Sequence, residues 1–302
     1  MNVLLANDRN VRWVHPVAWW SWALCAAAAA SLTSNPLALI SIAVAALCVV
    51  LTRGAHAPWA ASISGLLKIA LFVIVFRVFF QTLLGAPIGL HVMFVVPEAE
   101  LPGFLSGLRL GGAFTVESLV LGVVEGLRFA AILLCIAAAT TVAAPSRLFR
   151  ALPDALADIG TVLVIAMTFA PHLVQDFARI RSSQRLRGRR DRGVRAAARA
   201  LAPVVDGAME RSLTLAAAMS SRGYGRARAT RHRPDTWKSV ESVVVLSGVC
   251  ALAITLLQAL TTANTQLSLA PLMWPTLSPI YVLALLALLL PAFLTPMTPG
   301  TD

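Results

Sequence analysis

The chain has 302 residues, of which 58% are hydrophobic and only 13% are charged, and its mean hydropathy is +0.78. A soluble domain carries about 25% charged residues, so this composition excludes an ordinary water-soluble protein. The four cysteines lie in apolar stretches more than 20 residues apart, which excludes a disulfide-rich secreted scaffold. The composition predicts an all-α, polytopic membrane protein.

The positive charge of the chain is concentrated in one block. Residues 171–239 contain 16 basic and 5 acidic residues, a surplus of 11, which equals the surplus of 25 basic over 14 acidic residues in the whole chain. The basic and acidic residues elsewhere therefore balance. An arginine-rich module is expected between membrane segments.

Six apolar stretches are expected to cross the bilayer as helices, since about 20 apolar residues span its hydrocarbon core. They lie at about 17–33, 37–51, 63–83, 116–142, 240–260 and 279–294. Residues 85–115, between the third and fourth spans, are marked by Gly, Pro and polar residues and are expected to form a loop.

The distribution of Lys and Arg sets the expected orientation, because cytoplasmic loops are enriched in these residues. With the N- and C-termini in the cytoplasm, the basic block lies inside and the loop with Glu98 and Glu100 lies outside. The protein is therefore expected in the cell inner (plasma) membrane. Three parts are predicted: a membrane domain at 1–144, a cytoplasmic helical module at 145–239, and C-terminal spans at 240–302.

The helical module is expected to begin with a short apolar segment. Residues 159–170 are strongly apolar, but about a dozen residues are too few for a typical span. We expect a buried or membrane-lying helix here, followed by a separate helix that begins at Pro171.

Two helices of the module are each expected to end in an Arg-Gly pair. One ends at Leu186-Arg187-Gly188, and the other, from Pro203, ends at Ser221-Arg222-Gly223. Glycine at such a position favours a left-handed helix cap, and an arginine there complements the helix dipole by about 0.3–1 kcal/mol. One pair alone would need no further explanation. Two pairs in one basic module favour docking, because a guanidinium pairs bidentately with a carboxylate of a partner.

These residues resemble the transmembrane T component of energy-coupling factor transporters, the CbiQ-like family. The resemblance is carried by Pro171-His172-Leu173, Gln184 to Gly188, Ala208-Met209-Glu210-Arg211-Ser212 and Ala218 to Tyr224. The family has two Ala-Arg-Gly motifs at the ends of cytoplasmic coupling helices. Here Leu186 and Ser221 replace the two alanines, while both Arg-Gly pairs are kept.

The resemblance implies a coupling subunit of an ABC-type importer. It implies as partners two cytoplasmic ABC ATPase subunits, a substrate-binding membrane S component and the lipid bilayer. Arg187 and Arg222 would dock the ATPases, with Gly188 and Gly223 shaping the helix ends. The implied supporting residues of the coupling helices are Pro171, Arg185, Glu210, Arg211 and Met219. This chain would bind no cofactor, since ATP and Mg would be held by the ATPases, and the cargo would be a vitamin or a transition-metal ion such as cobalt.

The sequence favours a subunit without catalytic activity of its own. The nearest match to a phosphate-binding loop, Gly188 to Arg195, has Val194 where the lysine must stand. The five histidines are scattered, so no metal site is expected. A stand-alone secondary transporter or other permease stays open as the alternative, although no repeated halves are visible.

The remaining charged residues allow weaker inferences. No aromatic residue lies between Arg179 and Arg199, which disfavours nucleic acid and favours attraction to anionic lipid. Glu125 and Arg128 are three residues apart in the fourth span and are expected to pair, with contact to the S component as the alternative. Lys68 and Arg77 in the third span receive no assigned role.

Overall fold

The computed structural model divides the chain into two compact units, each described by itself. The bundle unit comprises Met1–Pro145 and Asp235–Asp302, and the helix-pair unit comprises Ser146–Pro234. The structure describes residues 14–53, 63–84, 91–100, 109–143, 145–151, 156–187, 194–225, 237–261, 268–269, 272–273 and 278–294.

The bundle unit is built from apolar helices. They are α1 (Pro16–Leu32), α2 (Pro36–Arg53), α3 (Ile63–Leu84), α4 (Val116–Val142), α8 (Ser239–Thr261), α9 (Pro279–Ala287) and α10 (Leu290–Leu294). The predicted stretches are confirmed as helices within a few residues, with the sixth divided into α9 and α10. Helices α2, α3, α4 and α8 are long and apolar enough to cross a membrane, whereas α1 and the α9–α10 segment are shorter. The protein is therefore an all-α, multi-pass membrane protein.

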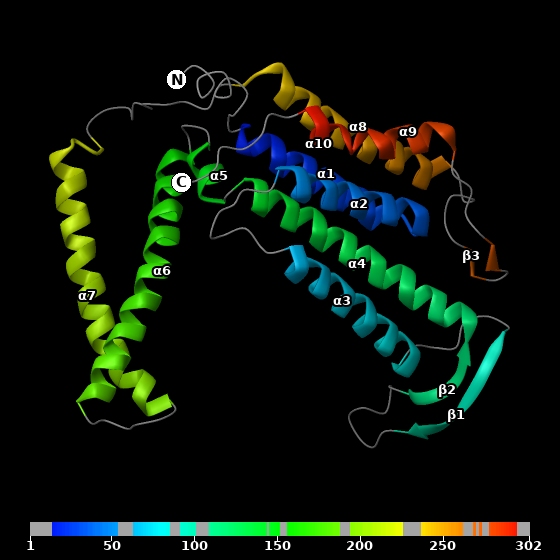
Figure 1. Cartoon of the computed structure of the whole chain (residues 1–302), viewed down its shortest axis with the longest axis horizontal. Helices are drawn as coiled ribbons and strands as arrows, with labels where there is room; N and C mark the ends of the chain where they lie inside the picture. The colour runs from blue at the N-terminus through cyan, green and yellow to red at the C-terminus, as the bar shows by residue number, and fades with distance from the viewer. Residues whose placement is uncertain are drawn as a thin grey trace, which may run out of the picture. The chain divides into compact units, whose positions relative to one another are not determined.

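Helix α4 occupies the middle of the bundle unit, with α3 on one side and α1 and α2 on the other, while α8 packs on α1 (Figure 1). Small residues permit this packing: Ala26, Ala29 and Ala30 of α1 are almost fully buried. Where the apolar environment offers no hydrophobic drive between helices, close backbone approach supplies the attraction.

The closest helix contact lies between α3 and α4 at a Gly-x-x-x-Gly sequence. A Cβ atom added to Gly126 would lie 2.9 Å from Cα of Ile74, and one added to Gly122 would lie 3.2 Å from Cα of Val78. The two glycines therefore let the backbones of α3 and α4 touch. Gly248 of α8 allows a similar approach to Trp22 of α1, where an added Cβ would lie 3.0 Å from Cα.

The predicted loop at 85–115 needs correction, because it contains an antiparallel hairpin. Strand β1 (Val92–Glu100) pairs with β2 (Arg109–Thr115), with Val92 opposite Thr115 and Glu100 opposite Arg109. The run of Val and Phe residues in β1 suits a pleated strand better than a loop. A second, two-residue pairing joins β3 (Ser268–Leu269) to β4 (Leu272–Met273).

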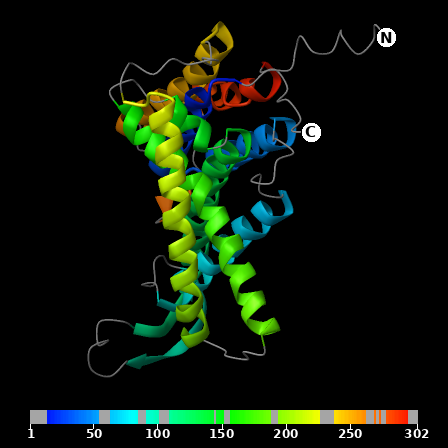
Figure 2. The ribbon, with the colours of Figure 1, turned by 90° about the vertical axis from the view of Figure 1, so that its left-hand side faces the viewer.

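The helix-pair unit consists chiefly of two long helices. These are α6 (Ala157–Leu186) and α7 (Val194–Ser221), preceded by the short α5 (Pro145–Arg150), whose first residue belongs to the bundle unit. Helices α6 and α7 run in opposite directions and cross (Figures 1 and 2).

Both helices begin earlier than the sequence predicted. We expected a separate short helix at 159–170 and a new helix from Pro171, but α6 is continuous and holds Pro171 in its interior. Likewise α7 begins at Val194, and Pro203 lies inside it. A proline removes one backbone hydrogen bond, and the helical residues on both sides maintain the helix across that gap. The apolar segment is also not buried, since Ile159 and Val162 are exposed within the unit. As part of Asp158–Leu186 it belongs to a helix that is long and apolar enough to cross a membrane, so the expectation that it is too short for a span is wrong.

Candidate functional site

The C-terminal end of α7 is a complete Schellman cap. Gly223 has a φ of +78°, its N–H donates to the carbonyl of Ser220 at 3.0 Å, and the N–H of Tyr224 donates to the carbonyl of Met219 at 3.0 Å. These two bonds satisfy helix carbonyls that would otherwise lack partners. The predicted left-handed glycine at position 223 is confirmed. Arg222, directly before it, is exposed at the helix end.

The C-terminal end of α6 is more open. Arg187 is the cap residue, with a φ of −80°, and its N–H donates to the carbonyl of Ser183 at 3.1 Å. Leu186 is 89% exposed, and Arg185 and Arg187 are exposed as well. Gly188 lies outside the described residues, so the predicted second glycine turn stays a prediction.

The two arginine ends point to opposite ends of the helix pair, because α6 and α7 are antiparallel (Figures 1 and 2). Over residues 156–187 and 194–225, neither the Arg187 nor the Arg222 guanidinium forms an ion pair with another described residue. Each helix of the pair therefore presents at least one exposed arginine at its C-terminus.

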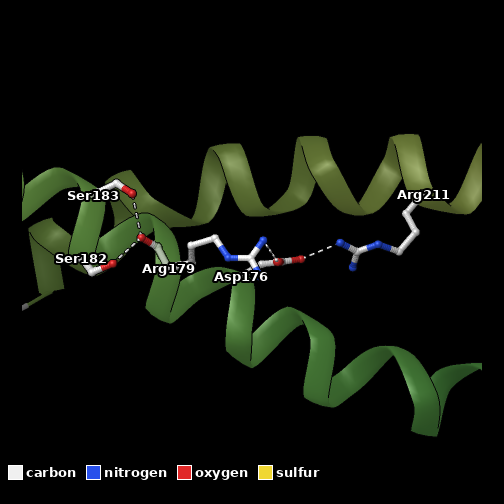
Figure 3. A network of polar contacts seen from close by, with 5 residues as sticks. All are labelled: Asp176, Arg179, Ser182, Ser183 and Arg211. Carbon is white, nitrogen blue, oxygen red and sulfur yellow. Dashed lines mark hydrogen bonds and ion pairs between the residues drawn. The ribbon is translucent and has the colours of Figure 1, made fainter.

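A polar network joins α6 to α7 (Figure 3). Nη2 of Arg211 on α7 donates to Oδ2 of Asp176 on α6 at 2.8 Å, and Nη1 of Arg179 lies 3.7 Å from Oδ1 of the same carboxylate. The hydroxyls of Ser182 and Ser183 donate to the backbone oxygen of Arg179 in the preceding turn. Asp176 is thus held both from its own helix and from the neighbouring one.

The charged half of α6, residues 171–186, carries one carboxylate and several arginines. Within the network, the Asp176 carboxylate is matched by two guanidinium groups, one from each helix. Nη1 of Arg211 is buried without a hydrogen-bond partner in the described part of the chain. An ion pair that is open to solvent adds little to the free energy of folding. The main effect of the Asp176–Arg211 pair is therefore to orient the two helices.

A second polar contact joins the ends of the two helices. The hydroxyl of Tyr224, just beyond the α7 cap, donates to Oδ1 of Asp158 in the first turn of α6 at 3.2 Å. This contact ties the Arg222 end to the neighbouring helix. The Arg187 end shows no such tie among the residues that the structure describes.

An apolar groove runs between α6 and α7 and has a volume of about 590 Å³. Its walls include Leu173 and Val174 from α6, and Leu201, Val205 and Met209 from α7. Val174 and Met209 are 69% and 63% exposed, although both are apolar. The groove therefore exposes apolar surface whose contact with water is unfavourable.

The remaining predicted residues are spread along the helix pair. Pro171 and Glu210 are exposed, Arg211 forms the ion pair with α6, and Met219 is half-buried and takes part in the α7 cap. Sequence reasoning missed Asp176. Its spacing of three from Arg179 was a visible signal for a pair on one helix, but nothing in the spacing pointed across to Arg211.

The bundle unit contains the expected pair in α4. Nη1 of Arg128 donates to Oε1 of Glu125 at 2.7 Å, which confirms the predicted pair. Nε of Arg128 also donates to the carbonyl of Thr33 at 3.2 Å, which links α4 to the end of α1. Lys68 is exposed and Arg77 is half-buried on α3. Within the described ranges, no three His, Cys, Asp or Glu side chains lie close enough together to hold a metal ion.

The chain matches a known protein family. A family model described as CbiQ, cobalt transport protein, matches residues 10–233, a range that contains every helix from α1 to α7 and both arginine ends. No curated protein matches the chain.

Proposed function

The chain belongs to the CbiQ family of cobalt transport proteins, and from this premise we propose that it is the transmembrane coupling subunit of an energy-coupling factor importer. In this proposal two ATPase subunits bind the helix-pair unit from the cytoplasm. A small membrane protein, the S component, captures the cargo. The chain transmits movement between them and hydrolyses no ATP itself.

The observation that carries the proposal is the pair of exposed arginine ends. Arg187 and Arg222 each follow the last turn of a long helix and lie at opposite ends of the pair. A guanidinium held at a helix end by capped backbone reaches a carboxylate with two parallel hydrogen bonds. Two such ends, facing away from each other, suit two ATPase subunits with one arginine for each.

The apolar groove supports a contact with the S component. Its exposed Val174, Leu201 and Met209 offer a surface for an apolar helix, and burial of apolar area contributes about 25 cal/mol per Å². The stiffness of α6 and α7 then turns a displacement at the arginine ends into a displacement at the groove.

The cargo is set by the S component in this proposal. Because the family description names cobalt, a divalent cobalt ion is the first cargo to test, with nickel and vitamins after it. The orientation with both termini and the helix-pair unit in the cytoplasm is part of the same proposal.

Charge reversal at both arginine ends tests the docking role. The variant Arg187→Glu with Arg222→Glu, co-expressed with the ATPases, is expected to lose co-purification of the ATPase pair. Arg150→Glu, an exposed residue of α5 in the same unit, is the matched control and is expected to keep the complex. Normal co-purification of the double variant would refute the docking role, and gradient-driven cobalt uptake by the chain alone would instead support a secondary transporter.

A further inference from the structure

The packing between α6 and α7 is mostly apolar and therefore weakly directional. Ala200 and Val204 of α7 are buried at the contact, while the neighbouring groove residues stay largely exposed. Apolar contacts of this kind tolerate sliding, because their energy depends on area rather than on direction. The crossing of the two helices thus needs another determinant.

The Asp176–Arg211 contact has the directionality that the apolar contact lacks. The carboxylate on α6 accepts at 2.8 Å from a guanidinium on α7, and Arg179 holds the same carboxylate from its own helix (Figure 3). The contact lies in the interior of both helices, away from Arg187 and Arg222. It is also the one ion pair between α6 and α7 that the described residues form.

The Asp176–Arg211 pair is not explained by a contribution to the stability of the helix-pair unit. Both side chains retain contact with solvent, so the attraction is screened, and one nitrogen of Arg211 is buried without a partner. An apolar pair at these positions would extend the groove without an unpartnered polar atom. The remaining physical effect of the pair is to select one register and one crossing of the helices.

We propose that Asp176 and Arg211 are positioning residues that fix the crossing of α6 and α7, so that displacement of one arginine end reaches the other end and the groove. This inference rests on the proposed coupling function. Loss of the pair would leave both docking ends intact but would let the helices slide against each other. ATP hydrolysis would then continue with less transport for each ATP consumed.

The first experiment measures ATP hydrolysed per cobalt ion imported by the full complex in liposomes. Asp176→Asn and Arg211→Gln are expected to keep ATPase co-purification and to raise this ratio at least about fivefold, the lower end of usual coupling between sites. Arg179→Gln is the matched control, because it removes the partner on α6 and leaves the bond to α7. An unchanged ratio in Asp176→Asn would overturn the proposal.

A charge exchange separates a positioning role from a general loss of structure. In the Arg179→Gln background, Asp176→Arg is expected to raise the ratio, and adding Arg211→Glu is expected to restore it. Failure of the second substitution to restore the ratio, in a complex of normal yield, would contradict a specific role for the pair.

A second measurement does not depend on the coupling function. Nitroxide labels are placed at Ser183 and Thr214, both exposed, in a chain whose four native cysteines are replaced by alanine. Their distance distribution in nanodiscs, without any partner, is expected to broaden in Asp176→Asn and to stay narrow in Arg179→Gln. An unchanged distribution in Asp176→Asn would refute the positioning role. A broadened distribution in a chain that binds no ATPase would refute only the proposed function.

Discussion

The bundle unit and the helix-pair unit use their residues in opposite ways. In the bundle unit, alanines and glycines bring α1, α3, α4 and α8 into close contact, and the charged pair in α4 is satisfied inside the unit. In the helix-pair unit, two long helices bury few residues and leave several arginines exposed, whereas large apolar side chains are exposed in both units. The difference indicates that the bundle unit is held together by its own close packing, whereas the helix-pair unit presents exposed charges to its surroundings.

The largest effect is expected where the bundle packs most closely. Gly126→Val should separate α3 from α4, because its Cβ would meet the backbone of Ile74 at 2.9 Å. We expect a loss of about 1–3 kcal/mol in unfolding free energy, measured by thermal denaturation in detergent. Gly207→Ala on α7 is the control, since nothing lies within 4 Å of its added Cβ. Equal melting temperatures for both variants would contradict the contrast between the units.

Loss of the polar pair of the bundle is expected to have an effect of similar size. Arg128→Met leaves Glu125 without its partner in α4 and is expected to cost about 1–3 kcal/mol. Adding Glu125→Gln should recover part of that loss, because no unpaired charge then remains. Thermal denaturation of the single and double variants measures the coupling. A double variant less stable than Arg128→Met would show that the pair is not the relevant interaction.

A smaller effect is expected at the α7 cap. Gly223→Val forces a β-branched residue into a φ of +78°, at a cost of about 1–2 kcal/mol, which should fray the last turn. We expect weaker binding of the ATPase pair, measured by titration in nanodiscs, with the bundle unit unaffected. Gly207→Val, also on α7 and without the positive φ, is the control for valine in a helix. Full ATPase affinity in Gly223→Val would argue against a role for the cap in docking.

The smallest effect on stability is expected in the groove. Met209→Glu places a charge on a side chain that is already 63% exposed, so unfolding should change little. Association with the S component is expected to fall, measured by its co-purification. Leu213→Glu, on the same helix, 72% exposed and not part of the groove lining, is the control. Equal retention of the S component by both variants would remove the groove from the interface.

The sequence was sufficient for features that depend on local chemistry. The length of the apolar stretches predicted the helices of the bundle unit, and the glycine after Arg222 predicted the left-handed cap. Both features depend only on residues that are close together in the sequence. Spacing also located the Glu125–Arg128 pair, whose members share one face of α4.

Features that depend on distant residues were missed. The sequence predicts helix starts at Pro171 and Pro203, but a proline ends a helix only when the residues on either side cannot maintain it. The hairpin of β1 and β2 depends on pairing between two segments, and Asp176 and Arg211 are 35 residues apart. No local pattern specifies such partners.

The opposite directions of α6 and α7 have a consequence for stoichiometry. Each helix ends next to an exposed arginine, so under the proposed function a single copy of the chain has two like docking points, at opposite ends of the helix pair. Under the proposed function, one membrane subunit therefore offers one docking point to each member of an ATPase pair.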